Sequence, residues 1–266
     1  DQTTIERNLD GIAQEMSVNP VDIYLLQEVD TNSSRSFNIN QLSYFEESLE
    51  IGSSFAYNLN CIFVPYPIPF IGHVESGISI LTDFIVNEAY RISLPTSSSW
   101  PLSTCSPKQC LLVNRIPVDN SDKELIIINL QFDSYGDSYE KYEQFYQLKE
   151  VIAQEYLKGN YIIAGGDFSY LFPNTEQSSS GADNYWNPSS LTENDLPADF
   201  QYVTDTSVAS YRLLHSQGDS DLVDAQYYVV DGFIVSSNLL VESVKTLATD
   251  FEYSDHQPVI MSVTLK

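Results

Sequence analysis

Two apolar stretches of the sequence run almost directly into a carboxylate. Residues 23–26 are followed by a glutamine and Glu28, and residues 161–164 are followed by two glycines and Asp167. Short apolar runs bounded by turn residues are typical of strands that are buried on both faces. The glycines before Asp167 allow a backbone or a ligand to approach closely. Both acids are therefore candidates for a site at the ends of buried strands.

Further polar residues occupy similar positions along the chain. Gln131 ends another apolar run, and Asp231 interrupts one nearer the C-terminus. Asp255 and His256 come just before residues 259–263, the last apolar run. Carboxylate oxygens are suitable ligands for Mg²⁺, and a histidine polarised by an acid can activate a water molecule. Each fragment alone is common, but the combination of carboxylates and one histidine at strand ends is what a metal-dependent phosphoester hydrolase needs.

Helical periodicity separates some of these runs. Apolar residues recur at about helical spacing in stretches that predict helices near residues 5–16, 41–49 and 139–157. Residues 93–107 and 173–199 show neither periodicity and are predicted to be surface loops. Because several strand pairs read as hairpins, mixed sheets packed inside helices are favoured over a single parallel sheet.

The composition is that of a globular protein. Of 266 residues, 42% are hydrophobic and 18% are charged, and no repeat or linker divides the chain, so residues 1–266 are predicted to form one α/β domain. Twelve Lys and Arg residues against 37 Asp and Glu residues give a net charge of −25. This charge argues against non-specific nucleic-acid binding, but it is compatible with metal ions that screen one phosphate inside a cleft. Lys108 and Arg115 are among the few cations that could contact an anionic substrate, unless they are isolated surface charges.

The three cysteines are too few for a disulfide-built scaffold or a four-cysteine zinc site. Cys105 and Cys110 flank a turn-prone tetrapeptide and could close a small disulfide loop, or they could be unrelated. No apolar run approaches the roughly 18 residues that a membrane-spanning helix needs, and no signal peptide is recognisable at Asp1. The high Ser, Asn and Tyr content favours an extracellular protein.

These motifs, in this order along nearly the whole chain, resemble the endonuclease/exonuclease/phosphatase superfamily, the metal-dependent phosphoesterases related to pancreatic deoxyribonuclease. Leu26-Gln27-Glu28 resembles its metal-binding glutamate motif, and Gly166-Asp167-Phe168-Ser169 resembles its Gly-Asp-Phe-Asn motif. Val230-Asp231-Gly232-Phe233 is similar to the strand whose acid orients the catalytic histidine. Ser254-Asp255-His256, with Pro258, resembles the C-terminal Ser-Asp-His signature, which is the most specific of these pieces. Within the superfamily, the sequence looks most like a divergent bacterial branch that is often secreted or membrane-anchored.

The resemblance implies a fold, a cofactor and a role for each residue. The fold would be a four-layer α/β/β/α sandwich, with two mixed sheets face to face between helices. Glu28 would hold Mg²⁺ or Mn²⁺, with Asp255 close to the ion. His256 would act as general base or phosphate contact, oriented by Asp231, while Asp167 would align the attacking water. The substrate would be a phosphodiester or phosphomonoester, and the net charge favours a small or lipid-linked one over duplex DNA.

The sequence departs from the family pattern in three ways. Gln131 replaces a histidine that contacts the phosphate, and Ser169 replaces an asparagine that helps to position the reacting groups. Both remain candidates for substrate binding. The family also opens with a central strand that ends in asparagine, and the given sequence contains no such strand before its first helix.

These departures leave two hypotheses open. Gln131 can donate a hydrogen bond to a phosphoryl oxygen but cannot carry a positive charge. Losing a positioned donor or acid typically costs about 10²–10⁴ in rate. The protein is therefore either a phosphoesterase that is slow or altered in substrate, or a catalytically degenerate relative that serves as a binding or structural subunit.

Overall fold

The computed structural model describes residues 1–65, 70–96, 100, 104–134, 138–175, 178–179, 186–216 and 223–266. The two stretches predicted to be long surface loops therefore lie partly outside the described residues.

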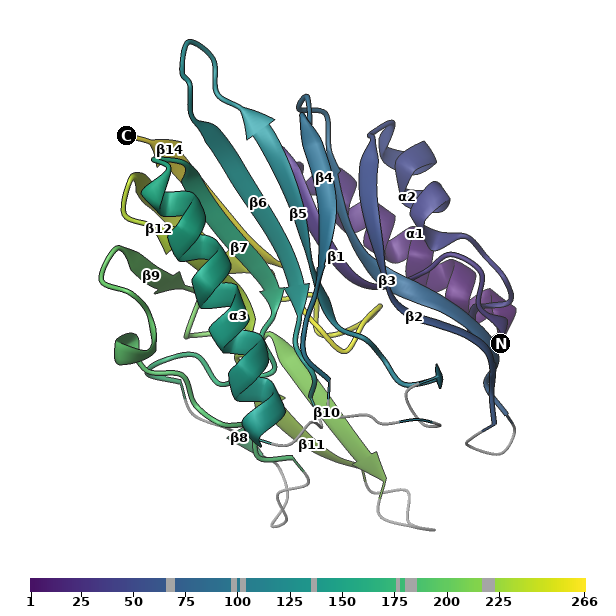
Figure 1. Ribbon diagram of the computed structural model, residues 1–266. Helices are drawn as coiled ribbons and strands as arrows, with labels where there is room; N and C mark the ends of the chain where they lie inside the picture. The colour runs from purple at the N-terminus through teal and green to yellow at the C-terminus, as the bar shows by residue number, and fades with distance from the viewer. Residues whose placement is uncertain are drawn as a thin grey trace.

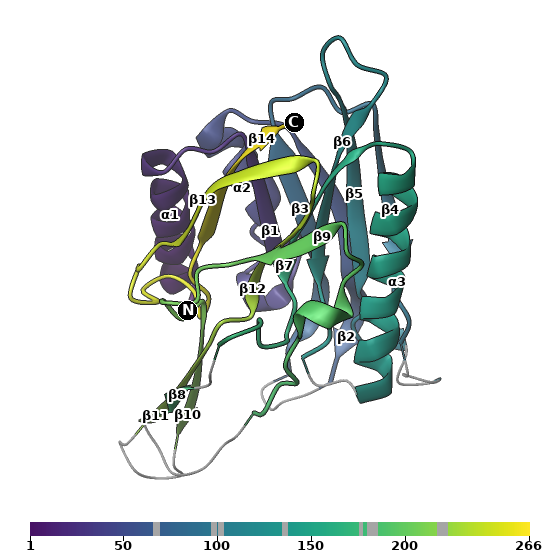
Figure 2. The same cartoon turned by 90° about the vertical axis from the view of Figure 1, so that its left-hand side faces the viewer.

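Two β-layers lie face to face, and helices cover both outer faces (Figures 1 and 2). The larger layer is a six-stranded sheet whose spatial order is β4 (Glu88–Ser93), β5 (Cys110–Pro117), β6 (Glu124–Gln131), β7 (Tyr161–Asp167), β12 (Asp231–Ser236) and β9 (Phe200–Val203). Only β6 and β7 run parallel, so the sheet is mixed, as predicted.

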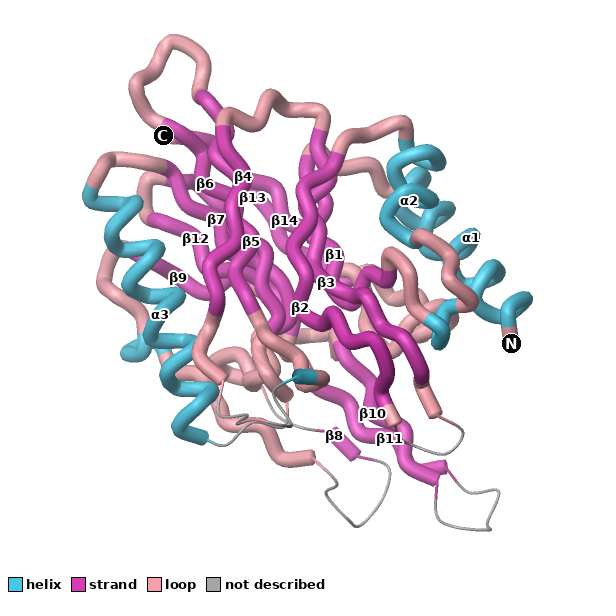
Figure 3. The backbone as a smooth tube through the Cα atoms, turned by 45° about the vertical axis from the view of Figure 1, so that its right-hand side comes forward, coloured by secondary structure: helices cyan, strands magenta, loops and turns pink. Residues whose placement is uncertain are grey.

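The second β-layer consists of two antiparallel pieces. The first has the order β1 (Ile23–Asp30), β3 (Gly72–Thr82) and β2 (Ser53–Val64), and the second pairs β13 (Leu239–Thr246) with β14 (Val259–Leu265). A further small sheet is formed by β10 (Tyr211–Ser216), β11 (Val223–Tyr228) and β8 (Ser178–Ser179). It projects from the end of the sandwich at which β6 and β7 finish (Figures 1 and 3).

Three helices close the two outer faces. α1 (Gln2–Val18) and α2 (Gln41–Leu49) cover the second layer, and α3 (Ser138–Leu157) covers the six-stranded sheet. Short 3₁₀ turns occur at η1 (Ser34–Ser36) and η3 (Glu193–Asp195). The Asp1 side chain caps α1 by accepting a hydrogen bond from the Thr4 N–H at 2.9 Å. All three helices predicted from periodicity are present.

Alternation along β6 explains why its sequence is apolar throughout. Ile126 and Ile128 pack under α3, whereas Leu125 and Ile127 face the second β-layer. A strand buried on both faces has no position at which a polar side chain can reach water, so every residue in the run is apolar. The four-layer α/β/β/α architecture is therefore confirmed.

The second layer differs from the prediction of strands buried on both faces. Residues 23–26 of β1 and most residues of β14 are only partly buried. In the described part of the chain, β1 pairs only with β3 and β14 pairs only with β13, so one edge of each strand has no neighbouring strand. The strand that the resemblance places before the first helix has no counterpart among these residues. None of the helices that the described residues form is long and apolar enough to cross a bilayer.

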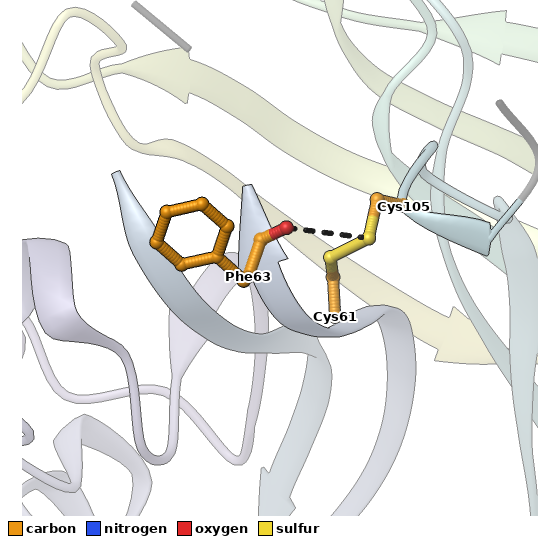
Figure 4. Close-up of a disulfide and its surroundings, with 3 residues drawn as sticks. All are labelled: Cys61, Phe63 and Cys105. Atoms are coloured by element: carbon orange, nitrogen blue, oxygen red, sulfur yellow. Dashed lines mark hydrogen bonds between the residues drawn. A yellow bond between two sulfur atoms is a disulfide. The ribbon is translucent and has the colours of Figure 1, made fainter. Parts of the chain in front are cut away.

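A disulfide joins Cys61, near the end of β2, to Cys105, with a Cα–Cα distance of 5.1 Å (Figure 4). The alternative pairing of Cys105 with Cys110, which the sequence left open, is wrong. Cys110 is fully buried at the start of β5, and its thiol donates to Asn58 Oδ1 at 3.1 Å. Burial raises the pKa of the Cys110 thiol to about 11.

Thiol titration checks this assignment. Without reductant, the native protein should show no fast-reacting thiol at pH 8, because Cys110 is buried and protonated. Denaturation should release one thiol, and denaturation with reductant should release three, which is the full cysteine count. Three thiols in the denatured protein without reductant would contradict the disulfide.

Candidate active site

Asp167 is the last residue of β7, and the position before it, Gly166, can be occupied only by glycine. A Cβ on Gly166 would collide with the Leu130 carbonyl of β6, and Gly166 has a φ of 139°, which side-chain-bearing residues rarely adopt. Gly166 therefore allows β6 and β7 to approach closely at their ends, whereas a Cβ on Gly165 would collide with the side chains of Phe233 and Leu25. This places Gln131 beside Asp167, its partner in the parallel β6–β7 ladder.

Asp231 faces Asp167 across the antiparallel β7–β12 pair. Its carboxylate lies 2.9 Å from His256 Nδ1, and the two side chains are 13% and 32% exposed respectively. The Asp231 backbone is held in place because its N–H donates to Ser210 Oγ at 3.1 Å. A carboxylate on Nδ1 directs the other ring nitrogen, Nε2, away from the acid. This contact is compatible with the orienting role that the resemblance implies for Asp231.

The segment that carries His256 is fastened to the start of β10. The Arg212 N–H donates to the Asp255 carbonyl at 2.9 Å, and the Gln257 N–H donates to the Ser210 carbonyl at 2.7 Å. The Tyr211 ring lies 4.5 Å from the imidazole, measured between ring centroids. Sequence reasoning missed Tyr211, because its contact depends on how β10 packs against the last loop.

The protonation of this cluster follows from its burial and charges. Burial disfavours the charged form of His256, but the nearby carboxylates, Asp231 first among them, outweigh burial and raise the pKa of the imidazole to about 10. Burial also raises the pKa of Asp167 to about 7, a rise that the His256 charge opposes and the Asp231 charge increases. At neutral pH His256 therefore carries a proton, and Asp167 titrates close to neutrality.

Ser169 is buried against the carboxylate of Asp167. It is 1% exposed, its N–H donates to Asp167 Oδ1 at 2.7 Å, and its hydroxyl lies 3.2 Å from both carboxylate oxygens. The same hydroxyl lies 2.9 Å from Ser134 Oγ. Ser169 therefore orients a buried carboxylate, and its contact with substrate stays a prediction. Its burial could not be inferred from the motif.

Glu28 lies at the end of β1 in a strained backbone position. The β1–β3 register shifts between Leu26 and Val29, and Glu28 has a φ of 55°, an uncommon value for a residue with a side chain. Such a conformation costs on the order of 1–3 kcal/mol and is found mainly where function requires it. The shift leaves the Glu28 side chain exposed at the end of the strand.

Gln131 links Glu28 to the six-stranded sheet. Its Nε2 donates to Glu28 Oε1 at 2.8 Å, and its Oε1 accepts from Asn58 Nδ2 at 3.3 Å. Asn58 comes from β2, on the far side of β3 from β1, and sequence reasoning did not find it. Gln131 stands where the resemblance predicts a phosphate-contacting histidine, and it holds the carboxylate of the predicted metal ligand.

Arg35 is a further charged residue near the site, and sequence reasoning did not identify it as a candidate. Its guanidinium makes two hydrogen bonds to the buried Asp30 carboxylate, at 2.8 and 3.0 Å, and a third to Ser76 Oγ at 3.2 Å. The carboxylate of Asp30 and the nearby charge of Glu28 both raise the pKa of Arg35, while its burial opposes the rise. The bond to Asp30 fixes the turn that follows β1, and with it the backbone that carries Glu28.

The structure brings the predicted residues together in two connected groups at one end of the sandwich. One group is the acid–imidazole cluster of Asp167, Asp231 and His256, next to which Asp255 lies on the exposed loop. The other is the hydrogen-bonded pair of Glu28 and Gln131, and the β6–β7 ladder joins the two groups. Within the described residues, no three His, Cys, Asp or Glu side chains converge to form a complete metal cage.

Comparisons with known proteins bear on the fold. The sequence matches no protein-family model and no curated protein. The structure is similar to an endonuclease/exonuclease/phosphatase from Beutenbergia cavernae, with a TM-score of 0.69 and 14% identity, over 97% of this chain and 66% of that one. It is also similar to an endonuclease/exonuclease/phosphatase from Bacteroides vulgatus, with a TM-score of 0.65 and 14% identity, over 98% and 91%. A mannosyl-6-phosphatase from Bacteroides thetaiotaomicron gives a TM-score of 0.60 and 15% identity, over 98% and 92%.

These similarities define the class of fold. The chain has the α/β fold of the endonuclease/exonuclease/phosphatase proteins, as its motifs predicted. At this level of sequence identity the likeness establishes the architecture, and activity has to be argued from the site itself.

The His256–Asp231 pair predicts a pH dependence in protein without added metal. Asp231→Asn should lower the pKa of His256, because the imidazolium loses its nearest anion and stays partly buried. The raised pKa of His256 adds to the free energy of unfolding. This contribution is fully present below the ordinary histidine pKa of 6.5 and is lost as the pH rises towards about 10. The free-energy difference between native protein and Asp231→Asn should be about 2 kcal/mol at low pH and shrink above neutrality.

An NMR titration of the His256 ring and unfolding curves from pH 6 to 10 measure both effects. Asp119→Asn, in the exposed turn after β5, is the matched control and should leave the titration unchanged. An unaltered His256 titration in Asp231→Asn would contradict the proposed cause of the shift.

Proposed function

We propose that this protein hydrolyses a phosphoester, with Mg²⁺ or Mn²⁺ as cofactor. The observation that carries the proposal is the Asp231–His256 hydrogen bond of 2.9 Å, placed beside the buried Asp167 at the ends of β7 and β12. An acid of near-neutral pKa beside a protonated imidazole can act in general acid–base catalysis.

Each member of the cluster has a chemical task in this proposal. Protonated His256 donates through Nε2 to a phosphoryl oxygen and stabilises the negative charge that develops there. Asp167, with a pKa of about 7, accepts a proton from the attacking water. Asp231 keeps the imidazole in the required orientation, as carboxylates do in other catalytic pairs.

The residues present fit a divalent cation that keeps several waters. Mg²⁺ is commonly held by one or two carboxylates together with substrate phosphate oxygens, and a full protein cage is not required. Glu28 is exposed at its strand end and shares only Oε1 with Gln131, so it is the residue that would hold the ion, with Asp255 as the second acid. The ion would supply Lewis-acid polarisation of the phosphoryl group.

The same proposal covers the substrate and the compartment. A net charge of −25 favours a small or lipid-linked phosphoester over a nucleic-acid duplex. A location outside the cell is supported by the Cys61–Cys105 disulfide, since disulfides persist mainly in oxidising compartments.

Hydrolysis of bis-(p-nitrophenyl) phosphate with Mg²⁺ or Mn²⁺ tests the activity. His256→Ala and Glu28→Gln should each lower kcat/KM by about 10²-fold or more, because each removes a group that contacts the phosphate or its ion. Lys158→Gln, at the far end of α3, is the control that should retain native activity.

The outcome also decides between the two hypotheses. Native protein that hydrolyses none of a broad panel of phosphomonoesters and phosphodiesters, with either metal, would favour a catalytically degenerate binding or structural subunit. One observation favours this alternative: the Gln131 side chain is hydrogen-bonded to both Glu28 and Asn58. Its amide is therefore already engaged at the position where the family has a phosphate-binding histidine.

Metal binding provides a prediction that does not require turnover. At about a hundredfold excess over its Kd, Mn²⁺ should raise the Tm of the native protein by about 5–10 °C. Glu28→Gln should abolish this shift, because the amide is a much weaker ligand than the carboxylate. Glu88→Gln, an exposed acid on β4, should preserve it. Equal shifts for native protein and Glu28→Gln would rule out Glu28 as the ligand.

A further inference from the structure

A small polar pocket opens between β2, β4 and the segment before β5. It has a volume of about 110 Å³, and its lining includes Tyr57, Asn58, Asn60, Arg91, Ser106 and Lys108. A water molecule takes up about 30 Å³ in the liquid, so the pocket has room for three or four water-sized groups. That is enough for one phosphate or carboxylate group and too little for a sugar ring.

The pocket holds two of the twelve basic residues in a chain of net charge −25. Among the described residues, neither Arg91 nor Lys108 forms an ion pair, so no described carboxylate lies within ion-pair distance of either side chain. Arg115, the other cation that the sequence proposed for substrate contact, differs from Lys108 because it is paired with carboxylates. It pairs with Glu124 at 2.6 Å and Glu155 at 3.0 Å at the other end of the sheet, so this cation does not contact substrate.

The walls of the pocket are fixed before any ligand enters. Arg91 donates to the carbonyl of Tyr57 at 3.1 Å and to the carbonyl of Lys108 at 2.8 Å, and so joins two walls. The Lys108 N–H donates to the Asn58 carbonyl at 2.6 Å. The Cys61–Cys105 disulfide ties the same two segments together covalently (Figure 4). A pocket that is already ordered loses little conformational freedom on binding.

One residue joins the pocket to the candidate active site. The β2–β3 register shifts between Tyr57 and Leu59, so Asn58 is the extra residue of a β-bulge. Bulges redirect side chains and are frequent beside active sites. Asn58 lines the pocket while its Nδ2 donates to Gln131 Oε1, and Gln131 in turn binds Glu28. The pocket therefore lies two hydrogen bonds from the proposed metal ligand.

We propose that this pocket is a second anion subsite, which binds a phosphate or carboxylate group of the substrate distant from the phosphoryl group that is cleaved. The proposal rests on the proposed function, because the phosphoester supplies the first anionic group. It narrows the substrate class to small molecules that carry two anionic groups. Arg91 and Lys108 supply the positive charge that such a group needs.

A binding experiment tests the subsite without requiring turnover. The probes are α,ω-alkanediol bisphosphates with two to six methylene groups, each compared with its monophosphate by calorimetry in the His256→Ala background with Mg²⁺. At the chain length that spans both sites, the bisphosphate should bind about 10- to 100-fold more tightly, the gain of one charge-assisted contact. Lys108→Gln should remove this preference, and Lys158→Gln should retain it.

The results separate this proposal from the proposed function. The subsite would be refuted if the bisphosphate showed no preference over the monophosphate at any chain length. It would also be refuted if the preference survived Lys108→Gln, or if it disappeared equally in Lys158→Gln. Because the readout is a ratio of affinities, it can succeed in a protein that hydrolyses nothing. Conversely, hydrolysis of bis-(p-nitrophenyl) phosphate without any bisphosphate preference would sustain the activity and refute the subsite.

Discussion

One buried amide holds the two β-layers in register at the end where the site lies. Asn129, fully buried in β6, donates to the carbonyls of Leu26 and Ser79 in the opposite layer, each at 2.8 Å, and accepts from Gln27 Nε2 at 2.7 Å. Replacing it with an apolar residue would remove all three hydrogen bonds and leave the carbonyl of the fully buried Ser79 without this partner, at a cost of about 1–3 kcal/mol. Only with this register can Gln131, two residues further on, reach Glu28 in the other layer.

At the end of the sandwich where the site lies, a pair of buried carboxylates and a basic pocket lie on opposite sides of Gln131, although the chain as a whole is acidic. Two carboxylates, Asp167 and Asp231, face each other across neighbouring strands, and the His256 proton compensates for their repulsion. On the other side of Gln131, Arg91 and Lys108 form a basic pocket. An anionic ligand would therefore be attracted to one end of a molecule whose overall charge repels it, which favours small ligands that fit entirely within that end.

The sequence predicted the features that depend on local patterns. Long apolar runs identified the central strands, and the acids that follow or interrupt such runs made Asp167 and Asp231 candidates. The pattern predicted Asp231 inside a strand, whereas it begins β12 and faces Asp167 at the end of β7. Features that depend on distant pairing were not predictable. The partner of Cys105, the bulge at Asn58 and the burial of Ser169 all follow from register between segments far apart in the chain. Strands such as β2 and β13 were missed because exposed residues interrupt their apolar pattern.

The disulfide also has a topological effect. Cys61 and Cys105 are 44 residues apart, and β3 and β4 lie between them, so this part of the chain forms a closed covalent ring. A single peptide-bond cleavage anywhere in the ring opens it but releases no fragment. In an environment rich in extracellular proteases, the chain would keep its mass apart from one added water, and its central strands would stay tethered on both sides of the cut. Such a molecule stays in one covalent piece after a single cut in this region as long as its surroundings remain oxidising.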